Sequence, residues 1–367
     1  MNMFSRHKII GEGEFGCTIK PHYKCPEFVE KENKTYVSKL VPSNLDEYNE
    51  MLMNKIRTIT DYNKYYIIQE ANCKLVTPKL HIKVHNKCKM CQKIDCSSGN
   101  INNNILEYGG INLKKFLEDT NVSPADSVLL NIMQKLSVGL LLLHEKNIVH
   151  RDIKPENIVV GQNNPNIDAR YIDWGLTMCD IGCNANDMDN ILGEPAKAFG
   201  TRMYNSPEIL IPTLGEGEKG LQELENTYKH LQTYNIKWFT DIIDNILTTY
   251  RELFTNRENY ITEIRYGADL YNIDLWKKND IFMLGITFAH IVQHIKQQDV
   301  LIQLAQMIKK MLAHHDTRIT LPEIIEILGY IENRPPEYEH KYMKYKLKYK
   351  QLKQMKQING LPVNYRI

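Results

Sequence analysis

The sequence predicts an α+β fold with a β-rich amino-terminal part and a larger helical part. Residues Ile9 to Ile19 are typical of two strands joined by a glycine-rich turn. Ser127 to Glu145 carries apolar residues at helical spacing instead. The chain has 367 residues, 43% hydrophobic and 25% charged, which is enough for a substantial core and typical of a globular protein.

Composition and charge also limit the partners and the compartment. The formal net charge of +2 argues against overall polyanion binding, so nucleic acid is not an expected partner. We expect no leader in Met1 to Ile10 and no transmembrane segment, because the strongest apolar run, Leu140 to Leu143, is far too short. We read this run as part of a buried helix. These features predict an intracellular, cytoplasmic protein whose eight cysteines are reduced thiols.

One short segment carries the most specific chemistry of the chain. It reads His150-Arg151-Asp152-Ile153-Lys154-Pro155-Glu156-Asn157, and a second acidic turn follows at Asp173-Trp174-Gly175. Phosphoryl transfer from a metal–nucleotide complex needs two carboxylates and an amide at this spacing. One carboxylate accepts the proton of the substrate hydroxyl, and the other holds Mg²⁺ together with the amide.

With these motifs, the chain resembles a eukaryotic-type protein kinase of the serine/threonine kind. The resemblance implies a bilobal fold, with ATP in the cleft between the lobes and Mg²⁺, or alternatively Mn²⁺, as the metal. The small β-rich lobe is expected at 1–106 and the larger helical lobe at 107–334.

The resemblance also assigns roles to the motif residues. Asp152 is the catalytic base, and Lys154 steadies the transferring phosphoryl group. Asn157 and Asp173 are the metal ligands, and Asp173 chelates the ion that bridges the phosphates. Trp174 stands where the family has phenylalanine, and its indole N–H needs a hydrogen-bond partner if it is buried.

The glycine-rich turn precedes the catalytic motif in the order that a kinase requires. Glycines let the backbone approach phosphates and present N–H donors to them. Thr18 replaces the family's valine and is expected to cover one face of the adenine with its methyl group. The turn residues assigned to nucleotide binding are Gly11, Glu12, Gly13, Glu14, Phe15 and Gly16.

Tyr36-Val37-Ser38-Lys39 takes the place of the family's V-A-I-K motif. The resemblance assigns Lys39 to the α- and β-phosphates and to an ion pair with a glutamate of the next helix. Val37 would narrow the adenine pocket slightly.

The helix that follows Lys39 is expected to supply the glutamate of the ion pair. A capping box at Ser43 to Asp46 predicts that this helix runs to about Ile59. Glu47 and Glu50 share one face of it; Glu50 is our first choice as the partner of Lys39, and Glu47 stays open.

Ile105 to Gly110 resembles the hinge between the lobes. Leu106 would gate the back of the pocket. Backbone groups of Glu107 and Gly109 would hydrogen-bond the adenine edge.

Gly200 to Glu208 resembles the segment with which serine/threonine kinases shape a peptide-binding platform. In such a segment Thr201 bridges Asp152 and Lys154. A protein substrate with a Ser or Thr hydroxyl is therefore the expected partner. The resemblance further implies that Asp280 braces the backbone of the catalytic loop and that Arg318 pairs with Glu208.

Four residues offer a candidate structural Zn²⁺ site. The cysteines Cys88, Cys91 and Cys96, with His85, could supply four ligands. The second half of a C-x₂-C…C-x₂-C pattern is missing, so reduced thiols in a loop between strands are the favoured alternative.

Two further segments depart from the family pattern. An insertion at about 212–278, helical and amphipathic from Ile236 to Phe254, is either a surface for a partner or structural filler. The segment 335–367 is rich in Lys and Tyr and predicts a helical tail, which would dock on the large lobe, self-associate or contact a partner. Such tails resemble those of proteins from nucleocytoplasmic large DNA viruses, which would place the chain in host cytoplasm or the virion.

The favoured hypothesis is a serine/threonine protein kinase that uses ATP. An alternative is a catalytically weak pseudokinase scaffold that binds nucleotide and a partner protein. It is disfavoured because Lys39, Asp152, Asn157 and Asp173 are all present. A small-molecule kinase of similar fold is a third hypothesis, and the peptide-platform segment argues against it.

Overall fold

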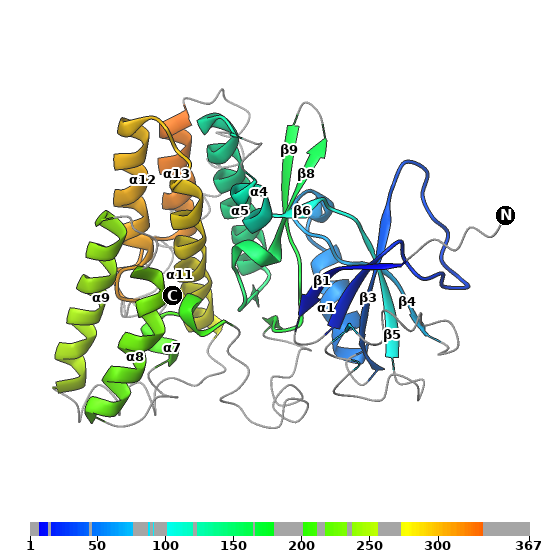
Figure 1. The fold of residues 1–367 in the computed structure, drawn as a ribbon, viewed down its shortest axis with the longest axis horizontal. Coiled ribbons are helices and arrows are strands. Elements are labelled where there is room, and N and C mark those ends of the chain that lie inside the picture. Colours follow the sequence, from blue (N-terminus) through cyan, green and yellow to red (C-terminus); the bar gives the residue numbers. More distant parts are fainter. Residues whose placement is uncertain are drawn as a thin grey trace, which may run out of the picture.

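The computed structural model describes most of the chain. The described residues are 7–13, 16–43, 46–75, 87–88, 91, 101–119, 123–163, 166–179, 201–210, 217–232, 237–255 and 273–332. Their arrangement is α+β, as predicted, with a sheet-containing lobe at one end and a helical lobe at the other (Figure 1).

The small lobe is built on a five-stranded antiparallel sheet in the order β1-β2-β3-β5-β4. Helix α1 (Asp46–Arg57) packs beside it (Figure 1). The close approach of β2 to β3 requires glycine at position 16, because a Cβ there would lie 2.2 Å from the carbonyl oxygen of Leu40. The strands are β1 (Lys8–Gly13), β2 (Gly16–Lys20), β3 (Tyr36–Pro42), β4 (Gln69–Lys74) and β5 (Ile101–Glu107).

Two smaller sheets carry the segments between the lobes. One has the order β6-β8-β9, and the other pairs β10 with β7. The catalytic motif lies between β7 and β8, so both sheets fix its ends. The bounds are β6 (Ile111–Asn112), β7 (Ile148–Val149), β8 (Ile158–Asn163), β9 (Asn166–Tyr171) and β10 (Met178–Cys179), with the 3-10 turn η4 (Pro155–Asn157) before β8.

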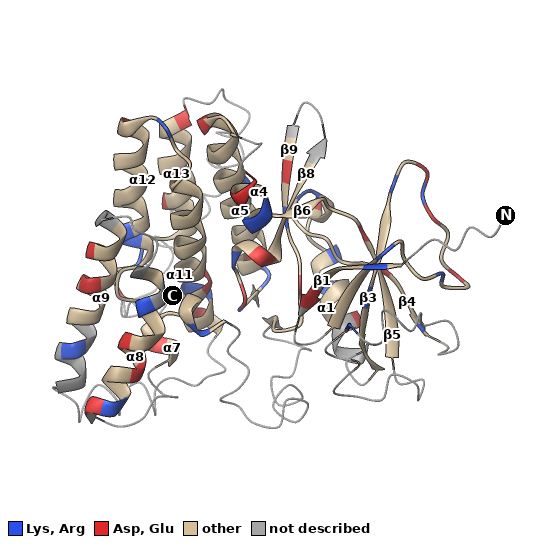
Figure 2. Cartoon of the chain, viewed as in Figure 1, with Lys and Arg blue, Asp and Glu red and all other residues tan. Residues whose placement is uncertain are grey.

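The large lobe is a helical assembly around α5 (Asp126–Glu145) and α11 (Ile273–Val292). Charged residues are frequent along α8 and α9 in Figure 2, whereas α11 has none after Asp280. This pattern agrees with burial, since α11 is enclosed by its neighbours from Asn279 to Ala289. The other helices are α4 (Leu113–Glu118), α7 (Pro207–Leu210), α8 (Gly217–Gln232), α9 (Lys237–Thr255), α12 (Gln298–Met311) and α13 (Leu321–Glu332), with the 3-10 turn η6 (Arg202–Tyr204) before α7.

The described part of the predicted insertion is helical, as expected. Helices α8 and α9 bury one apolar face each, with Tyr228 and Ile243 fully enclosed. The Tyr228 hydroxyl donates a 2.5 Å hydrogen bond to the backbone oxygen of Asn205. The insertion is therefore anchored to the segment just before α7. The predicted tail at 335–367 lies outside the described residues.

Helix α5 is long and apolar enough by composition to cross a membrane, the only such helix among the described residues. However, 61% of its most apolar window is buried inside the protein. Tyr66 and Tyr171 contact it directly, donating hydrogen bonds to the backbone oxygens of Gly139 and Leu136. These contacts are those of the core helix of a globular lobe, as the sequence predicted for Leu140 to Leu143.

The expectation of reduced thiols is wrong for the described cysteines, all of which are in disulfides. Cys17 of β2 is bonded to Cys88, and Cys25 is bonded to Cys73 of β4. Disulfides persist in oxidising surroundings, so the thiol argument for the cytoplasm no longer holds. The cytoplasmic localisation stays a prediction.

The structure also argues against the zinc site that was the less favoured alternative to reduced thiols. Zinc binds the cysteine thiolate, and a sulfur engaged in a disulfide no longer offers one. Cys88 and Cys91 are both disulfide-bonded, which removes two of the four proposed ligands. The other two, Cys96 and His85, lie outside the described residues.

Candidate active site

A cleft of about 1390 Å³ lies between the two lobes. Its lining combines apolar side chains from both lobes with charged and polar groups. Such a mixed lining suits a ligand that has both an apolar ring and charged groups. The apolar wall includes Val37, Ile67, Leu106, Val159 and Leu176.

Three side chains converge on the Asp152 carboxylate at the large-lobe side of the cleft. The Lys154 amine lies 2.9 Å from Oδ1 and 2.7 Å from Oδ2. The Asn157 amide donates to Oδ2 at 2.6 Å, and the Thr201 hydroxyl lies 3.4 Å from Oδ1. Lys154 also donates to the Thr201 hydroxyl at 2.8 Å. The structure thus brings together the four residues that the sequence assigned to catalysis on this side.

A buried carboxylate holds the backbone of the catalytic motif. Asp280, fully buried on α11, accepts hydrogen bonds from the backbone N–H groups of His150 and Arg151, each at 2.8 Å. Arg151 has a φ of 66°, a conformation that costs on the order of 1–3 kcal/mol in a residue other than glycine. The two charge-assisted hydrogen bonds offset this cost. The predicted bracing by Asp280 is confirmed.

Two histidines beside this network are neutral. His144 lies 3.2 Å from Asp280, and the ring of His150 lies 3.1 Å from the backbone oxygen of Ile172. Burial lowers the pKa of both imidazoles, and the nearby carboxylates only partly offset that effect. The network therefore carries no histidine charge near neutral pH.

Lys39 and Asp173 meet across the cleft. The Lys39 amine lies 2.5 Å from Oδ1 of Asp173, so the small lobe contributes a cation to the metal-binding side of the site. Burial raises the pKa of Asp173, but the neighbouring Lys39 charge outweighs it, and the net pKa is lowered. The carboxylate is thus held ionised, the form that binds a cation.

The ion pair expected between Lys39 and Glu50 is not formed. Glu50 is exposed on α1, and the Lys39 amine contacts Asp173 instead. The helix buries the face made by Leu52, Met53 and Ile56. Each helical residue advances by about 100°, which puts Glu50 well outside that face. The side chain of Glu47 is not described.

The glycine-rich turn and the hinge both line the cleft, as their assignment requires. Gly11, Glu12, Gly16 and Thr18 border it, while Glu14 and Phe15 lie outside the described residues. Gly13 ends β1 and pairs with Gly16.

The segment predicted to be the hinge also lines the cleft. Glu107 and Gly109 line it, and the Glu107 carboxylate is fixed from behind by Lys34 and by Arg170 at 2.9 Å. Burial raises the pKa of Glu107, and these two cations reverse the effect, so that its net pKa is lowered. Gly110 has a φ of 107°, which only glycine adopts readily.

Trp174 finds the partner that its indole needs. Its Nε1 donates a 2.7 Å hydrogen bond to the backbone oxygen of Ile67, and the ring packs on Tyr66 and His150. The tryptophan therefore replaces the family's phenylalanine without leaving a buried donor unsatisfied.

The residues assigned to a metal fit a hard divalent cation. Asp173 offers a carboxylate, and Asn157 uses its amide nitrogen toward Asp152, which leaves its oxygen for another ligand. Carboxylate and amide oxygens are the ligands that Mg²⁺ prefers. Both side chains line the same cleft.

The predicted pair at the end of the platform segment is confirmed. Arg318 donates to Oε1 and Oε2 of Glu208 at 3.1 and 3.2 Å, and both side chains are buried. This bidentate contact ties α7 to the turn before α13.

Sequence reasoning missed part of the apolar wall, namely Ile67, Val159 and Leu176. Val159 lies in β8, two residues after Asn157 at the end of the 3-10 turn η4. Its closeness to the catalytic motif was the signal available from the sequence. Ile67 and Leu176 lie in irregular segments and carry no comparable signal.

A comparison with known protein families identifies the domain that contains this cleft. Residues 4–328 match the family model of the protein kinase domain. The chain belongs to the protein kinase family. Its bilobal fold is that of the kinase domain, and Lys39, Asp152 and Asp173 all line the cleft between the lobes.

Relatives of the kinase include serine/threonine kinases. The chain is 32% identical over 133 residues to the inhibitor of nuclear factor kappa-B kinase subunit alpha of Xenopus tropicalis, covering 35% of this chain and 17% of the relative. It is 30% identical over 134 residues to the serine/threonine-protein kinase pakG of Dictyostelium discoideum, covering 35% of this chain and 10% of the relative. The chain therefore spans less than a fifth of the length of these relatives in the matched regions.

Proposed function

We propose that this kinase transfers the γ-phosphoryl group of ATP to a Ser or Thr hydroxyl of a protein. The observation that carries the proposal is the contact of the Lys154 amine with both Asp152 and Thr201. A lysine two residues after the catalytic aspartate, joined to a threonine of the platform segment, is the serine/threonine arrangement of the family. The relatives named above support the same acceptor class.

In this proposal each charged group acts at one atom of the reaction. Asp152 takes the proton of the acceptor hydroxyl as its oxygen attacks the γ-phosphorus, and the bond from that phosphorus to the β–γ bridging oxygen breaks. Lys154 lies beside Asp152 and stabilises the negative charge on the transferred group. ADP and the phosphorylated hydroxyl are the products.

Lys39 changes its partner when nucleotide binds. In the structure it lies against Asp173, and in the proposal its amine turns to the α- and β-phosphates. Asp173 and Asn157 are then the residues that hold Mg²⁺, which neutralises phosphate charge when bound. Asp173 is already ionised for this task, because Lys39 lowers its pKa.

Radiolabel transfer from γ-labelled ATP to a Ser/Thr/Tyr peptide library tests the proposal. We expect Asp152→Asn to lower the transfer rate by about 10²- to 10⁴-fold, because it removes a general base. The matched control is Asp299→Asn, which removes an exposed carboxylate of α12 far along the chain from the motif and should leave the rate unchanged. Phosphoamino acid analysis of the product should give phosphoserine and phosphothreonine.

Each other outcome has a defined meaning. Phosphotyrosine as the main product would contradict the proposed acceptor class. Transfer that is equal in the parent chain and in Asp152→Asn would contradict the assigned base. Nucleotide binding without any transfer would favour the pseudokinase scaffold.

Three remaining assignments are proposals of the same kind. The physiological substrate is a Ser- or Thr-containing protein, the partner surface is the α8–α9 hairpin or the carboxyl-terminal tail, and the localisation is cytoplasmic. A source among nucleocytoplasmic large DNA viruses is proposed from the insertion and the Tyr- and Lys-rich tail.

A further inference from the structure

A second cluster of chemically active side chains lies in the large lobe, outside the lining of the cleft. It consists of Glu208 in α7 and of His314 and His315 in the turn between α12 and α13. One ligand atom of each residue lies within 4.8 Å of the other two. Among the described residues, no other group of three or more His, Cys, Asp and Glu side chains meets this spacing.

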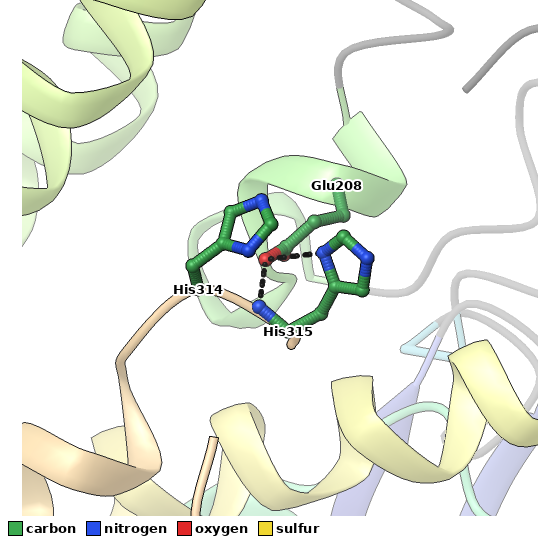
Figure 3. Close-up of side chains that lie close together, drawn as sticks. All are labelled: Glu208, His314 and His315. Atoms are coloured by element: carbon green, nitrogen blue, oxygen red, sulfur yellow. Dashed lines mark hydrogen bonds and ion pairs between the residues drawn. The ribbon is translucent and has the colours of Figure 1, made fainter. Parts of the chain in front are cut away.

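Figure 3 shows how the three side chains face one another. The two imidazole rings stand on either side of the Glu208 carboxylate, and their centroids are 4.2 Å apart. Oε1 of Glu208 accepts a hydrogen bond from the backbone N–H of His315 at 2.9 Å. This bond fixes the carboxylate oxygen between the rings, so the donor atoms are positioned by the backbone as well as by side chains.

One ring nitrogen in the cluster lacks a hydrogen bond. Nδ1 of His315 is buried, has no hydrogen-bond partner and lies 3.6 Å from Oε1 of Glu208, too far for a hydrogen bond. Leaving a buried polar atom without a hydrogen-bond partner is unfavourable. A cation between Nδ1 and Oε1 would bind both lone pairs and remove that cost.

A neighbouring carboxylate selects the tautomer that a metal needs. Oδ1 of Asp316 lies 3.2 Å from Nε2 of His315 and therefore draws the ring proton to that nitrogen. In the neutral ring, Nδ1 then carries a lone pair directed at Glu208. A carboxylate behind the ligating histidine is a recurrent feature of protein metal sites.

We propose that Glu208, His314 and His315 form a binding site for a borderline divalent transition metal such as Zn²⁺. Two imidazoles and one carboxylate suit Zn²⁺ better than Mg²⁺ or Ca²⁺, which prefer oxygen ligands. The charge balance gives the same selectivity. Arg318 contacts Glu208 and neutralises it, so little net negative charge remains to attract a hard cation.

The site joins α7, at the end of the platform segment, to the turn before α13, so bound metal would add a second link beside the Glu208–Arg318 pair.

Isothermal titration of the full chain with Zn²⁺ tests the site without reference to catalysis. The protein is used after tag removal and dialysis into metal-free buffer without thiol reductants. We expect a single saturable Zn²⁺ site and no comparable heat with Mg²⁺. His315→Gln should weaken Zn²⁺ binding by more than tenfold, and Asp316→Asn by about 10- to 100-fold.

His22→Gln is the matched control, because His22 lies in the small lobe beside Glu30 and outside the cluster. It should leave the affinity unchanged. The proposal is overturned if the parent chain binds no Zn²⁺ saturably, or if His315→Gln binds Zn²⁺ as tightly as the parent.

If circular dichroism shows that a variant does not fold, a second measurement on the parent chain still tests the site. Co²⁺ added to the parent chain should give the visible absorption of a tetrahedral nitrogen- and oxygen-ligated ion, which Zn²⁺ then abolishes by displacement. Absence of these bands would also overturn the proposal.

Discussion

The two lobes position the charged side chains of the cleft through different sets of contacts. On the large-lobe side, Asp152 is contacted by Lys154, Asn157 and Thr201, and buried Asp280 fixes the backbone beneath them. On the small-lobe side, Lys39 reaches across to Asp173, while Glu50 of α1 is turned to solvent. The large-lobe side is thus held by several contacts, whereas under the proposed function Lys39 on the small-lobe side has to leave Asp173 when a nucleotide binds.

The two lobes also differ in the interactions that stabilise the structure around the cleft. The small lobe is cross-linked by disulfides between segments far apart in sequence, with separations of 71 and 48 residues. The large lobe has the buried Glu208–Arg318 ion pair and shares a continuous apolar core with α1, and its Cys179 is disulfide-bonded as well. The two small-lobe disulfides join segments of the sheet and its loops, and neither involves α1.

The largest effect on stability is expected from the large-lobe ion pair. Arg318→Met leaves the Glu208 carboxylate buried without its bidentate partner, which typically costs about 3–5 kcal/mol. Urea unfolding at neutral pH measures the change. The control is Lys309→Met on the exposed side of α12, and an equal loss in both variants would refute the proposed dependence on the buried pair.

The second prediction compares Lys39 with Glu50. Lys39→Met should lower the phosphoryl-transfer rate by roughly 10²- to 10³-fold, as removal of a preorganised electrostatic group does. Glu50→Gln should change it by no more than about two- to threefold, the range typical of exposed sites. Steady-state kinetics with ATP and a peptide substrate measures both. A large loss in Glu50→Gln would show that α1 rotates inward during the reaction.

The third prediction concerns the small-lobe cross-links. Removing either bond, by Cys17→Ser or Cys25→Ser, should lower stability by about 2–4 kcal/mol, because the unfolded chain gains conformational freedom. Hydrogen exchange read by mass spectrometry should show faster exchange in β2 and β3, with α5 and α11 unchanged. Uniform acceleration across both lobes would contradict the difference in how the lobes are held.

The smallest effect is expected from His290 of α11, which lies 3.1 Å from the Tyr204 hydroxyl. Burial lowers its pKa from 6.5 to about 4. Between these values the unfolded chain takes up a proton that the folded chain does not, so stability is complete above pH 6.5 and falls as the pH approaches 4. The loss amounts to at most about 3 kcal/mol at 1.36 kcal/mol per pKa unit.

His290→Gln should flatten this part of the stability profile, measured by urea unfolding at about pH 7 and about pH 4.5. His144 and His150 act in the same direction, since burial lowers their pKa values as well. The difference between parent and variant therefore isolates His290. Parallel profiles would mean that His290 does not titrate in this range.

The sequence predicted the large-lobe site more completely than the small-lobe site, and the reason is geometric. Asp152, Lys154 and Asn157 lie within six residues of one loop, so their spacing in sequence nearly determines their spacing in space. Their partner Thr201 came from a family motif, and the structure brings it to Asp152. The rotation of α1, which decides where Glu50 points, depends on packing that no local pattern encodes.

The cysteines were misread for a related reason. Cys17 and Cys88 are 71 residues apart, yet their Cα atoms lie 5.9 Å apart in the folded chain. Pairing depends on this proximity, and the spacing within Cys88-x-x-Cys91 suggested a metal instead. The fold class was predictable because the ordered motifs resemble those of the protein kinase family, and the helical spacing of apolar residues from Ser127 to Glu145 agreed with it.

The hydrogen bond from Tyr228 to Asn205 links helix α8 of the insertion to the segment that carries Thr201. Asn205 stands four residues after Thr201, and its neighbour Ser206 is held by Asn279. Under the proposed function, a partner protein bound to the outer surface of α8 would act on the segment of Thr201 through Tyr228 and Asn205. A contact far from Asp152 could in this way change the position of the acceptor hydroxyl.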